Sequence, residues 1–309
     1  MDAWVQAMRR GDFATAWRIS DGVLKHRLRT GEMCDSWPRH LQFVWRGEPL
    51  AGQRLFVRCY HGLGDTLQFV RLLATPRLRP AEITLWAQPQ LLTLLRTVRG
   101  IDRLLPLHEG EPDLDYDVDV ELMELPHALR LEIGELPGPL PYIYVSAPPQ
   151  RRLATRRIGI CWRSGDWRAQ RSIPVDELRA WASLPDIRWF NLQFPPEPCE
   201  LPAAPIACRD IAEMAVRLRL LDLVITVDTM IAHLAGALGL PVWLLLDHDP
   251  DWRWMSDRDD SPWYPTMRLF RQHRPGDWTG VLEEVRGELG GRARPAPGIG
   301  SSGYRASLD

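Results

Sequence analysis

The stretch LDLVITVDTMIAHLAGALGLPVWLLL, residues 221–246, predicts a strand, a short helix and a second strand. A mostly apolar run ends at Asp228 and Thr229, and the small and apolar residues that follow stop at Gly239, before the run PVWLLL. The short apolar runs are of strand length, and the helix between them joins strands that lie parallel in one sheet. This unit therefore predicts an α/β fold.

The first turn of this helix would suit a phosphate group. Its N-terminus offers free backbone N–H groups and the positive end of the helix dipole. Thr229 and His233 are four residues apart, so they share one face of the helix. The alternative is a capped helix in which His233 is buried in the core, where its ring nitrogens have hydrogen-bond partners. The small residues of the helix permit close packing on the sheet in either case.

The same alternation of strands and helices runs through two parts of the chain. It begins at RLFVRC, residues 54–59, and restarts at RRIGICWR, residues 156–163. Prolines and a shift in charge mark a linker near residues 146–155. We therefore predict two doubly wound, Rossmann-like domains that face each other across a cleft. Ligands of such sheets bind beyond the carboxyl ends of the strands, so the strand-to-helix turns are the places to search for a site.

The predicted domains are residues 46–150 and 151–289. Residues 1–45 are predicted to be a small helical segment that resembles one tetratricopeptide unit, although a single unit cannot stack into a solenoid. The last amphipathic helix has Asp277 as its expected N-cap and is predicted to pack back across the junction. The tail, residues 290–309, is rich in Gly, Pro, Ser and Arg and is predicted to be disordered.

The composition favours a globular protein of the cytoplasm. The net charge of -2 lacks the excess of positive charge that is typical of proteins that bind nucleic acid, and no apolar run reaches the length of a membrane span. The N-terminal residues lack the apolar core of a signal peptide. The five cysteines are scattered and form no C-x-x-C pair, which indicates free thiols in a reducing compartment. We therefore expect neither a membrane span nor a nucleic-acid partner.

The turn RCYHGLGDTLQFVRLL, residues 58–73, places a carboxylate where a strand becomes a helix. It lacks the third glycine of a G-x-G-x-x-G fingerprint, which disfavours a nicotinamide dehydrogenase. The helix is predicted to begin near Asp65 or Thr66. Asp65 is either a plain N-cap or a general base that faces the cleft, since a carboxylate at a helix N-terminus stays ionised and can accept a proton.

Two further segments carry polar or aromatic side chains near the expected cleft. The loop CWRSGDWRAQRSIP contains Arg163 and Arg171 and should lie beside the Thr229 helix, where arginine could bind phosphate. The segment DHDPDWRWMSDRDDSPWYP offers aromatic rings that either stack on a ligand or pack under a long loop. Its aspartates and His248 have no spacing typical of metal ligands, so we expect no metal site.

The motifs HGLGDTLQFVRLL and VDTMIAHLAGALGLPVWLLL together resemble glycosyltransferase family 9, the bacterial heptosyltransferases. The resemblance covers most of residues 54–289. It is strongest to the branch often attached to tetratricopeptide repeats, whose ends read much like SPWYPTMRLFRQ. The resemblance implies a GT-B fold, a nucleotide-sugar donor held mainly by the second domain, no metal or other cofactor, and inversion at the anomeric carbon.

The resemblance also implies roles for individual residues. Asp65 takes the place of the family's general base. The family's donor-binding segment is matched by Asp228, Thr229, Met230 and His233. The family's heptosyltransferases use a lysine near the donor phosphates, but the only lysine here is Lys25, so Arg163 or Arg171 would substitute. Further candidates on the acceptor side or its loops are His61, Gly62, Gly64, His127 and Trp254.

Two functions remain open on the sequence. The first is an enzyme that moves a hexosyl or heptosyl group from a nucleotide sugar to a hydroxyl of a glycan, lipid or protein. The second is a non-catalytic module that binds a nucleotide or sugar, or serves as a scaffold. The missing lysine favours the module, whereas the intact Asp65 and the intact segment from Thr229 to His233 favour the enzyme.

Overall fold

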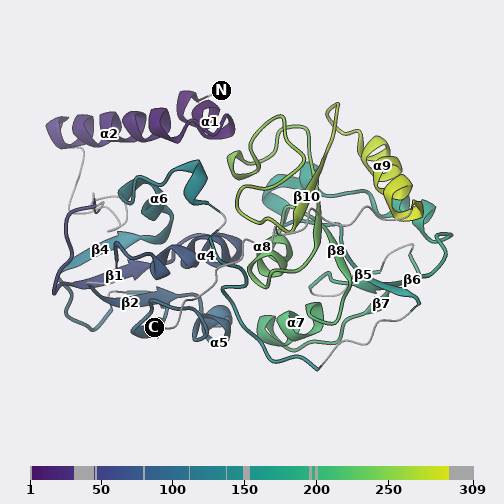
Figure 1. Ribbon diagram of the computed structural model, residues 1–309, viewed down its shortest axis with the longest axis horizontal. Coiled ribbons are helices and arrows are strands. Elements are labelled where there is room, and N and C mark those ends of the chain that lie inside the picture. Colours follow the sequence, from purple (N-terminus) through teal and green to yellow (C-terminus); the bar gives the residue numbers. More distant parts are fainter. Residues whose placement is uncertain are drawn as a thin grey trace, which may run out of the picture.

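Two parallel sheets divide the chain into two halves, which lie side by side in Figure 1. The computed structural model describes residues 2–30, 45, 47–78, 81–110, 112–136, 138–148, 154–194, 197–198 and 201–291. The first sheet has the strand order β3-β2-β1-β4, and the second has the order β10-β9-β8-β5-β6-β7. The predicted α/β class with two parallel, Rossmann-like sheets is confirmed.

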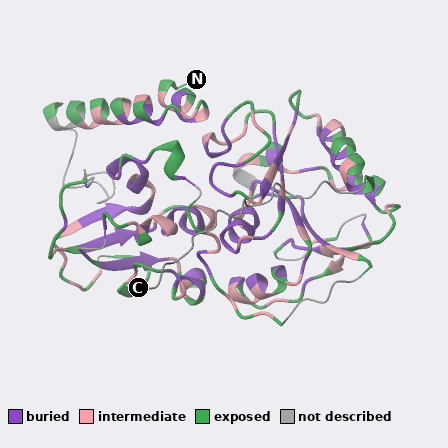
Figure 2. Cartoon of the chain, viewed as in Figure 1, coloured by how far each residue is buried: buried purple, intermediate pink, exposed green. Residues whose placement is uncertain are grey.

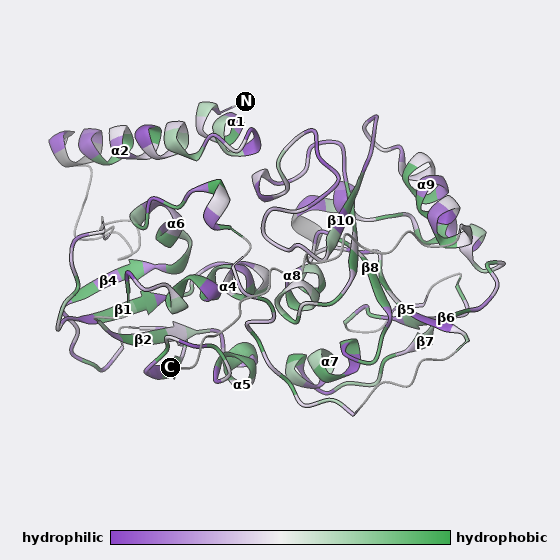
Figure 3. Ribbon diagram, in the orientation of Figure 1, coloured by the Kyte–Doolittle hydropathy of each residue, from purple (hydrophilic) through white to green (hydrophobic). Residues whose placement is uncertain are grey.

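The strands come from separate parts of the sequence. Those of the first sheet are β1 (Arg54–Arg58), β2 (Glu82–Ala87), β3 (Arg103–Pro106) and β4 (Val118–Glu121). Those of the second sheet are β5 (Arg156–Cys161), β6 (Ile187–Asn191), β7 (Ala204–Pro205), β8 (Leu223–Val227), β9 (Val242–Leu246) and β10 (Met267–Arg271). The inner strands of both sheets are largely buried in Figure 2 and hydrophobic in Figure 3, as expected for sheets covered on both faces.

The helical elements connect these strands. In the first half they are α1 (Ala3–Arg9), α2 (Phe13–Thr30), α4 (Leu63–Phe69), η1 (Val70–Ala74), η2 (Pro89–Leu91), α5 (Leu92–Leu95), η3 (Leu122–Glu124), α6 (Leu125–Ala128) and η4 (Ile133–Glu135). In the second half they are η5 (Asp166–Arg171), η6 (Val175–Trp181), α7 (Ile211–Leu218), α8 (Met230–Ala237), η7 (Trp252–Trp254) and α9 (Trp278–Gly290). Here α denotes an α-helix and η a 3-10 helix.

Helices α4 and α8 lie next to each other between the two sheets, where the halves meet (Figure 1). Each follows the carboxyl end of a central strand, α4 after β1 and α8 after β8. Gly64 makes this approach possible, because a Cβ atom there would lie 2.8 Å from Cδ2 of His233 and 3.6 Å from Cα of Met230. The N-terminal turns of both helices are thereby brought to the boundary between the halves.

The ends of the chain differ in part from the sequence predictions. The N-terminal segment consists of two helices with a break at Gly11, whose φ is +73°. Asp277 is the N-cap of α9, as predicted, and accepts from N–H of Gly280. However, α9 does not pack back across the junction. Its apolar face packs against η6 and β10 of the second half, because its buried residues match the apolar outer face of that sheet.

Some predicted boundaries lie outside the described residues. They lie in residues 31–44 of the N-terminal segment, residues 149–153 of the predicted linker and residues 292–309 of the predicted disordered tail. Among the helices of the described residues, none combines the length and the apolar character needed to cross a bilayer.

Candidate functional site

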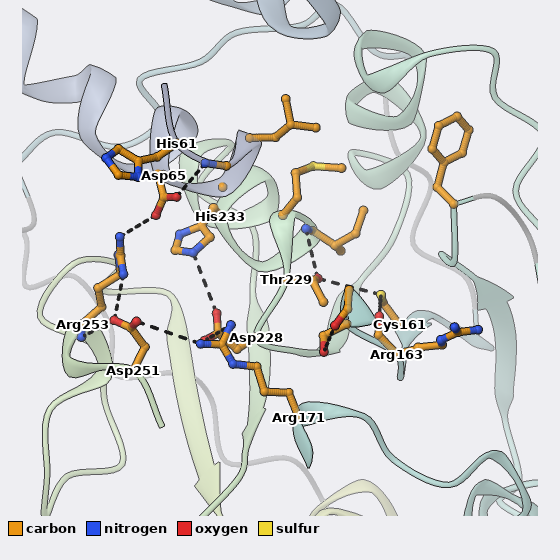
Figure 4. A pocket seen from close by; sticks show the side chains of 18 of the residues that line it. His61, Asp65, Cys161, Arg163, Arg171, Asp228, Thr229, His233, Asp251 and Arg253 are labelled. Carbon is orange, nitrogen blue, oxygen red and sulfur yellow. Dashed lines mark hydrogen bonds and ion pairs between the residues drawn. The ribbon is translucent and has the colours of Figure 1, made fainter. Parts of the chain in front are cut away.

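A cavity of about 720 Å³ opens between the two halves (Figure 4). Its walls come from strand-to-helix turns of both sheets and from loops of the second half. The turn after β1 contributes residues 61–65, and the turn after β8 contributes residues 228–231 and His233. The loops after β5 and β6, residues 251–253 and Met123 of η3 form the rest of the lining. This is the edge at which the carboxyl ends of parallel strands meet, where α/β proteins bind ligands.

The loop after β5 lies beside the turn after β8, as the sequence predicted. The two strands are parallel neighbours, with Cys161 in register with Thr226. The Sγ atom of Cys161 consequently lies 3.9 Å from Oγ1 of Thr229 at the start of α8. Arg163 and Arg171 both line the same cavity. The side chain of Arg163 is about half exposed and pairs with Glu197 at 2.9 Å.

The N-terminus of α8 faces the cavity and is capped by Thr229. The backbone of Thr229 is extended, and its Oγ1 accepts from N–H of Ile231 at 3.2 Å. Met230 and Ile231, the first two residues of the helix, also line the cavity. The remaining free N–H groups and the helix dipole make this turn attractive to an anion.

Two buried charges stand beside this turn. Nη1 of Arg171 lies 3.3 Å from Oδ2 of Asp228, and both side chains are about nine-tenths buried. Burial raises the pKa of Asp228, and the positive charge of Arg171 opposes that shift. The guanidinium is held in place by a carboxylate, yet it still borders the cavity.

His233 is buried but still borders the cavity from the second turn of α8. Its Nδ1 lies 3.1 Å from the hydroxyl oxygen of Tyr264, and its ring stacks on Trp254 with 5.4 Å between the ring centroids. Burial, and next the charge of Arg253, lower the pKa of His233 to about 4. The imidazole is therefore neutral at physiological pH, so it can form hydrogen bonds in the cavity without adding charge.

Asp65 faces the N-terminus of α8 from the other half of the molecule (Figure 4). It is the third residue of α4, and Gly62 occupies the N-cap position, so the helix begins earlier than the sequence predicted. Oδ2 of Asp65 accepts from N–H of Gly62 at 2.9 Å, and Oδ1 accepts from Nη2 of Arg253. The side chain is 27% exposed. The carboxylate thus caps the helix and lines the cavity at the same time.

Arg253 and Asp251 were not among the sequence candidates. The Arg253 guanidinium is buried and donates from Nη1 to Oδ1 of Asp251 at 2.8 Å. Asp251 lies 4.0 Å from Nη2 of Arg171. Acidic and basic groups therefore alternate across the cavity from Asp65 to Asp228 (Figure 4). The segment DPDWRW contains these alternating acidic and basic residues, but its sequence raised only the questions of metal binding and of aromatic stacking.

A second acidic group lies behind the turn after β1. His61 lines the cavity, and its Nε2 is 3.7 Å from Oε2 of Glu121 at the end of β4. Glu121 is buried, and burial raises its pKa to about 8. Gly62 and Gly64 complete the same wall of the cavity. Glu121 was missed because a lone acidic residue at a strand end carries no pattern of its own.

Two sequence candidates lie away from the cavity. His127 is buried in α6, with Nε2 2.9 Å from Oδ1 of Asp21 on α2, so its role is to hold α2 on the first half. Trp254 is fully buried beneath the ring of His233. Trp252, not Trp254, is the tryptophan that lines the cavity. Among the described residues, no group of three or more His, Cys, Asp and Glu side chains could hold a metal ion.

Comparison with known proteins places this geometry in a context. No protein-family model matches the chain. Protein FlbA of Caulobacter vibrioides is 23% identical over 332 residues, a match that covers 92% of this chain and 54% of that protein. The chain therefore spans about half the length of this curated relative.

Two solved structures share the fold. A glycosyl transferase family 9 protein of Veillonella parvula superposes with a TM-score of 0.54 at 11% identity, covering 77% of this chain and 90% of the other. TibC, an iron-containing dodecameric glycosyltransferase of enterotoxigenic E. coli, superposes with a TM-score of 0.53 at 15% identity, covering 75% and 66%. At these identities the likeness shows the fold, which is the two-domain GT-B arrangement, and does not identify the reaction.

Proposed function

We propose that this protein is an inverting, metal-independent glycosyltransferase that moves a sugar from a nucleotide-sugar donor to an acceptor hydroxyl. One observation carries the proposal. Asp65 on the first half faces, across one cavity, the N-terminus of α8 and the buried Arg171 on the second half. A base and an anion-binding site on opposite walls are what transfer between a hydroxyl and a sugar diphosphate requires.

The donor diphosphate would bind at the start of α8. Free N–H groups next to Thr229 and the guanidinium of Arg171 would hold its oxygens, with Arg163 at the cavity rim. Arginine is always charged and can bind phosphate through two parallel hydrogen bonds, so it can take the place of a lysine. The neutral His233 and the side chain of Met230 would contact the sugar or the diphosphate.

The transfer would run between the two walls. The acceptor oxygen attacks the anomeric carbon from the face opposite the diphosphate, and Asp65 takes the proton from that hydroxyl. The bond between the anomeric carbon and the diphosphate oxygen breaks, and its electron pair leaves with the diphosphate. The α8 dipole and Arg171 stabilise the negative charge that develops there. Attack from the opposite face inverts the anomeric carbon, and arginine supplies the charge that a metal ion would otherwise provide.

The replacement Asp65→Asn tests the role of the base. Asparagine keeps the size of the side chain, and its one amide oxygen can accept either from N–H of Gly62 or from Arg253. It cannot take up the proton, so turnover should fall by roughly a hundredfold or more, while the dissociation constant of the donor barely changes. Steady-state transfer of label from a nucleotide sugar and calorimetric titration of the donor measure the two quantities.

Asp251→Asn is the matched comparison for that test. It removes one carboxylate from the same series of ion pairs and leaves Asp65 in place. The loss of turnover should therefore be clearly smaller than for Asp65→Asn. Equal losses would mean that the charge balance of the cavity, rather than proton transfer at Asp65, controls the rate.

The second candidate is a non-catalytic nucleotide- or sugar-binding module of the same fold. It is favoured by one observation, that both carboxylate oxygens of Asp65 already have hydrogen-bond donors. A protein that binds nucleotide sugars in calorimetry, yet neither transfers nor hydrolyses them with glycan, lipid or protein acceptors, would have this function.

A further inference from the structure

The N-terminal helical hairpin, α1 and α2, spans both halves of the molecule. In Figure 1 it runs along one side of the protein, with α2 over the first half and α1 next to the second. Its two helices are joined by a hydrogen bond from Nε1 of Trp4 to Oγ of Ser20 at 3.1 Å. The hairpin is therefore one unit, and each of its helices has a separate set of contacts.

Helix α2 is attached to the first half. Nε1 of Trp17 donates to the carbonyl of Leu131 at 3.0 Å. Oδ1 of Asp21 lies 2.9 Å from Nε2 of His127 and accepts from Arg130 at 2.8 Å. Trp17 and His127 are buried there, so α2 is packed on the first half and not merely close to it.

Helix α1 is attached to the loop of residues 249–256 in the second half. Arg9 forms an ion pair with Asp249 at 2.6 Å and donates to the carbonyl of Pro250 at 2.5 Å. Its own carbonyl accepts from N–H of Ser256 at 2.9 Å. Arg9 therefore contacts both ends of the loop, and Trp4 packs edge-on against Trp252 in its middle, at 5.5 Å between ring centroids.

The same loop carries Arg253 to Asp65 on the first half. The Arg253 guanidinium lies 4.9 Å from the ring centroid of Trp252 and 5.4 Å from that of Phe69 on α4. Contacts thus continue from α1 through Trp252 and Arg253 to the helix that carries Asp65. Since Arg253 and Asp65 belong to different halves, any separation of the halves would break their ion pair.

We propose that the hairpin is a strap that holds the two halves together and fixes the loop 249–256, so that Arg253 positions Asp65 in the cavity. The effect on catalysis rests on the function proposed above, whereas the mechanical part does not. Arg253 is then a positioning residue. It aims the carboxylate of Asp65 through their ion pair, and the acceptor hydroxyl uses the remaining lone pairs.

Hydrogen–deuterium exchange of the full chain tests the strap directly. Arg9→Ala removes the ion pair to Asp249 and the bond to Pro250. The loss of one charge-assisted hydrogen bond should raise the population of the locally opened state by roughly tenfold. Exchange in residues 249–256 and 63–69 should therefore become roughly tenfold faster. Strands β5 and β8 should exchange as before. Arg18→Ala is the matched control, since exposed Arg18 bonds Thr15 within α2, and it should change neither segment.

The outcomes are separable from those of the proposed function. Unchanged exchange in residues 249–256 of both Arg9→Ala and Trp4→Ala would overturn the strap, whatever the activity. If the wild-type protein transfers no sugar but the exchange of the loop responds, the proposed function fails and the strap stands.

A further comparison isolates positioning by Arg253. If the enzyme is active, Arg9→Ala should lower kcat by roughly tenfold with little change in the donor KM, since the strap lies on the side of the base. Arg253→Lys, which keeps the charge, should recover part of the activity that Arg253→Gln loses. Equal activity of the two Arg253 variants would overturn the positioning role.

Discussion

At the scale of single residues, acidic and basic side chains alternate along the cavity, so the proposed anion site and the proposed base lie in one series of ion pairs. Three carboxylates, Asp65, Asp251 and Asp228, are interleaved with the guanidinium groups of Arg253 and Arg171. A buried cation without a partner would cost several kcal/mol, so each guanidinium is held between acidic groups. A diphosphate that approaches the α8 turn can share Arg171 with Asp228 without leaving that carboxylate uncompensated.

The donor assignment predicts a selective effect of Arg171→Ala. The variant should bind a nucleoside diphosphate roughly 10- to 100-fold more weakly, the usual cost of one hydrogen bond to a charged group, and should bind the free sugar nearly as well as before. Arg168→Ala is the control in the same loop, since Arg168 pairs with Asp247 at 3.3 Å instead of lining the cavity. Calorimetric titration measures all four affinities. Equal losses for the diphosphate and the sugar would indicate a general structural defect.

Glu121 predicts a dependence of stability on pH. Its pKa is raised from 4.5 to about 8, chiefly by burial, with Glu124 and Asp65 adding repulsion and Met123 N–H opposing the shift. The folded state therefore binds this proton more tightly than the unfolded state does. The stabilisation is complete below pH 4.5 and is lost as the pH rises to about 8.

The variant Glu121→Gln should remove that contribution. The free energy of unfolding of the variant minus that of the wild type should increase by on the order of 3 kcal/mol as the pH rises from about 5 to about 8.5. Urea unfolding at several pH values measures the difference, with Glu283→Gln on the exposed face of α9 as the control. A difference independent of pH would show that Glu121 is ionised throughout.

At the scale of elements, most of the fold followed from local patterns. The unit β8–α8–β9 and the strands β1 and β5 lie where apolar runs predicted them. The strands β3 and β10 were missed, because RLLP is short and ends in proline, and because two arginines interrupt the apolar run in MRLFR. Residues 175–181 form the 3-10 helix η6, a short segment whose position is set by packing on the sheet.

The contact between α4 and α8 predicts that Gly64→Ala destabilises the protein. The added methyl group would meet Cδ2 of the buried His233 ring at 2.8 Å, so the ring or the two helices must shift. We expect a loss of about 1–3 kcal/mol, typical of overpacking. Gly287→Ala in α9 is the control, because nothing lies within 4 Å of its added methyl group. It should stabilise the helix by about 0.5–1 kcal/mol. Equal effects in chemical denaturation would contradict the close contact.

At the scale of the whole molecule, what the sequence could not supply is the pairing between the halves. The turns that carry Asp65 and Thr229 were predicted from strand ends nearby in the chain. Arg253 pairs with Asp65 across 188 positions, and no local periodicity reports such a contact. The same limit explains His127, whose chemistry suggested a site but whose partner, Asp21, lies on the N-terminal hairpin. The role of such a histidine or arginine depends on residues distant in the sequence that the fold brings next to it.

A cavity bounded by both halves predicts that a nucleotide sugar stabilises the protein as a whole. A ligand bound only by the folded state at about 100 times its dissociation constant adds about 2.7 kcal/mol, which corresponds to roughly 5 °C in Tm for a chain of this size. A panel of nucleoside diphosphates and nucleotide sugars should contain at least one with such a shift, while free sugars give little. The shift should persist in EDTA, because arginine and the α8 turn, not a metal ion, would hold the diphosphate. NADH is the control, since the chain lacks the glycine fingerprint for a dinucleotide. A shift with NADH alone would replace the glycosyltransferase with a dehydrogenase, and a shift that EDTA abolishes would refute the metal-independent donor site.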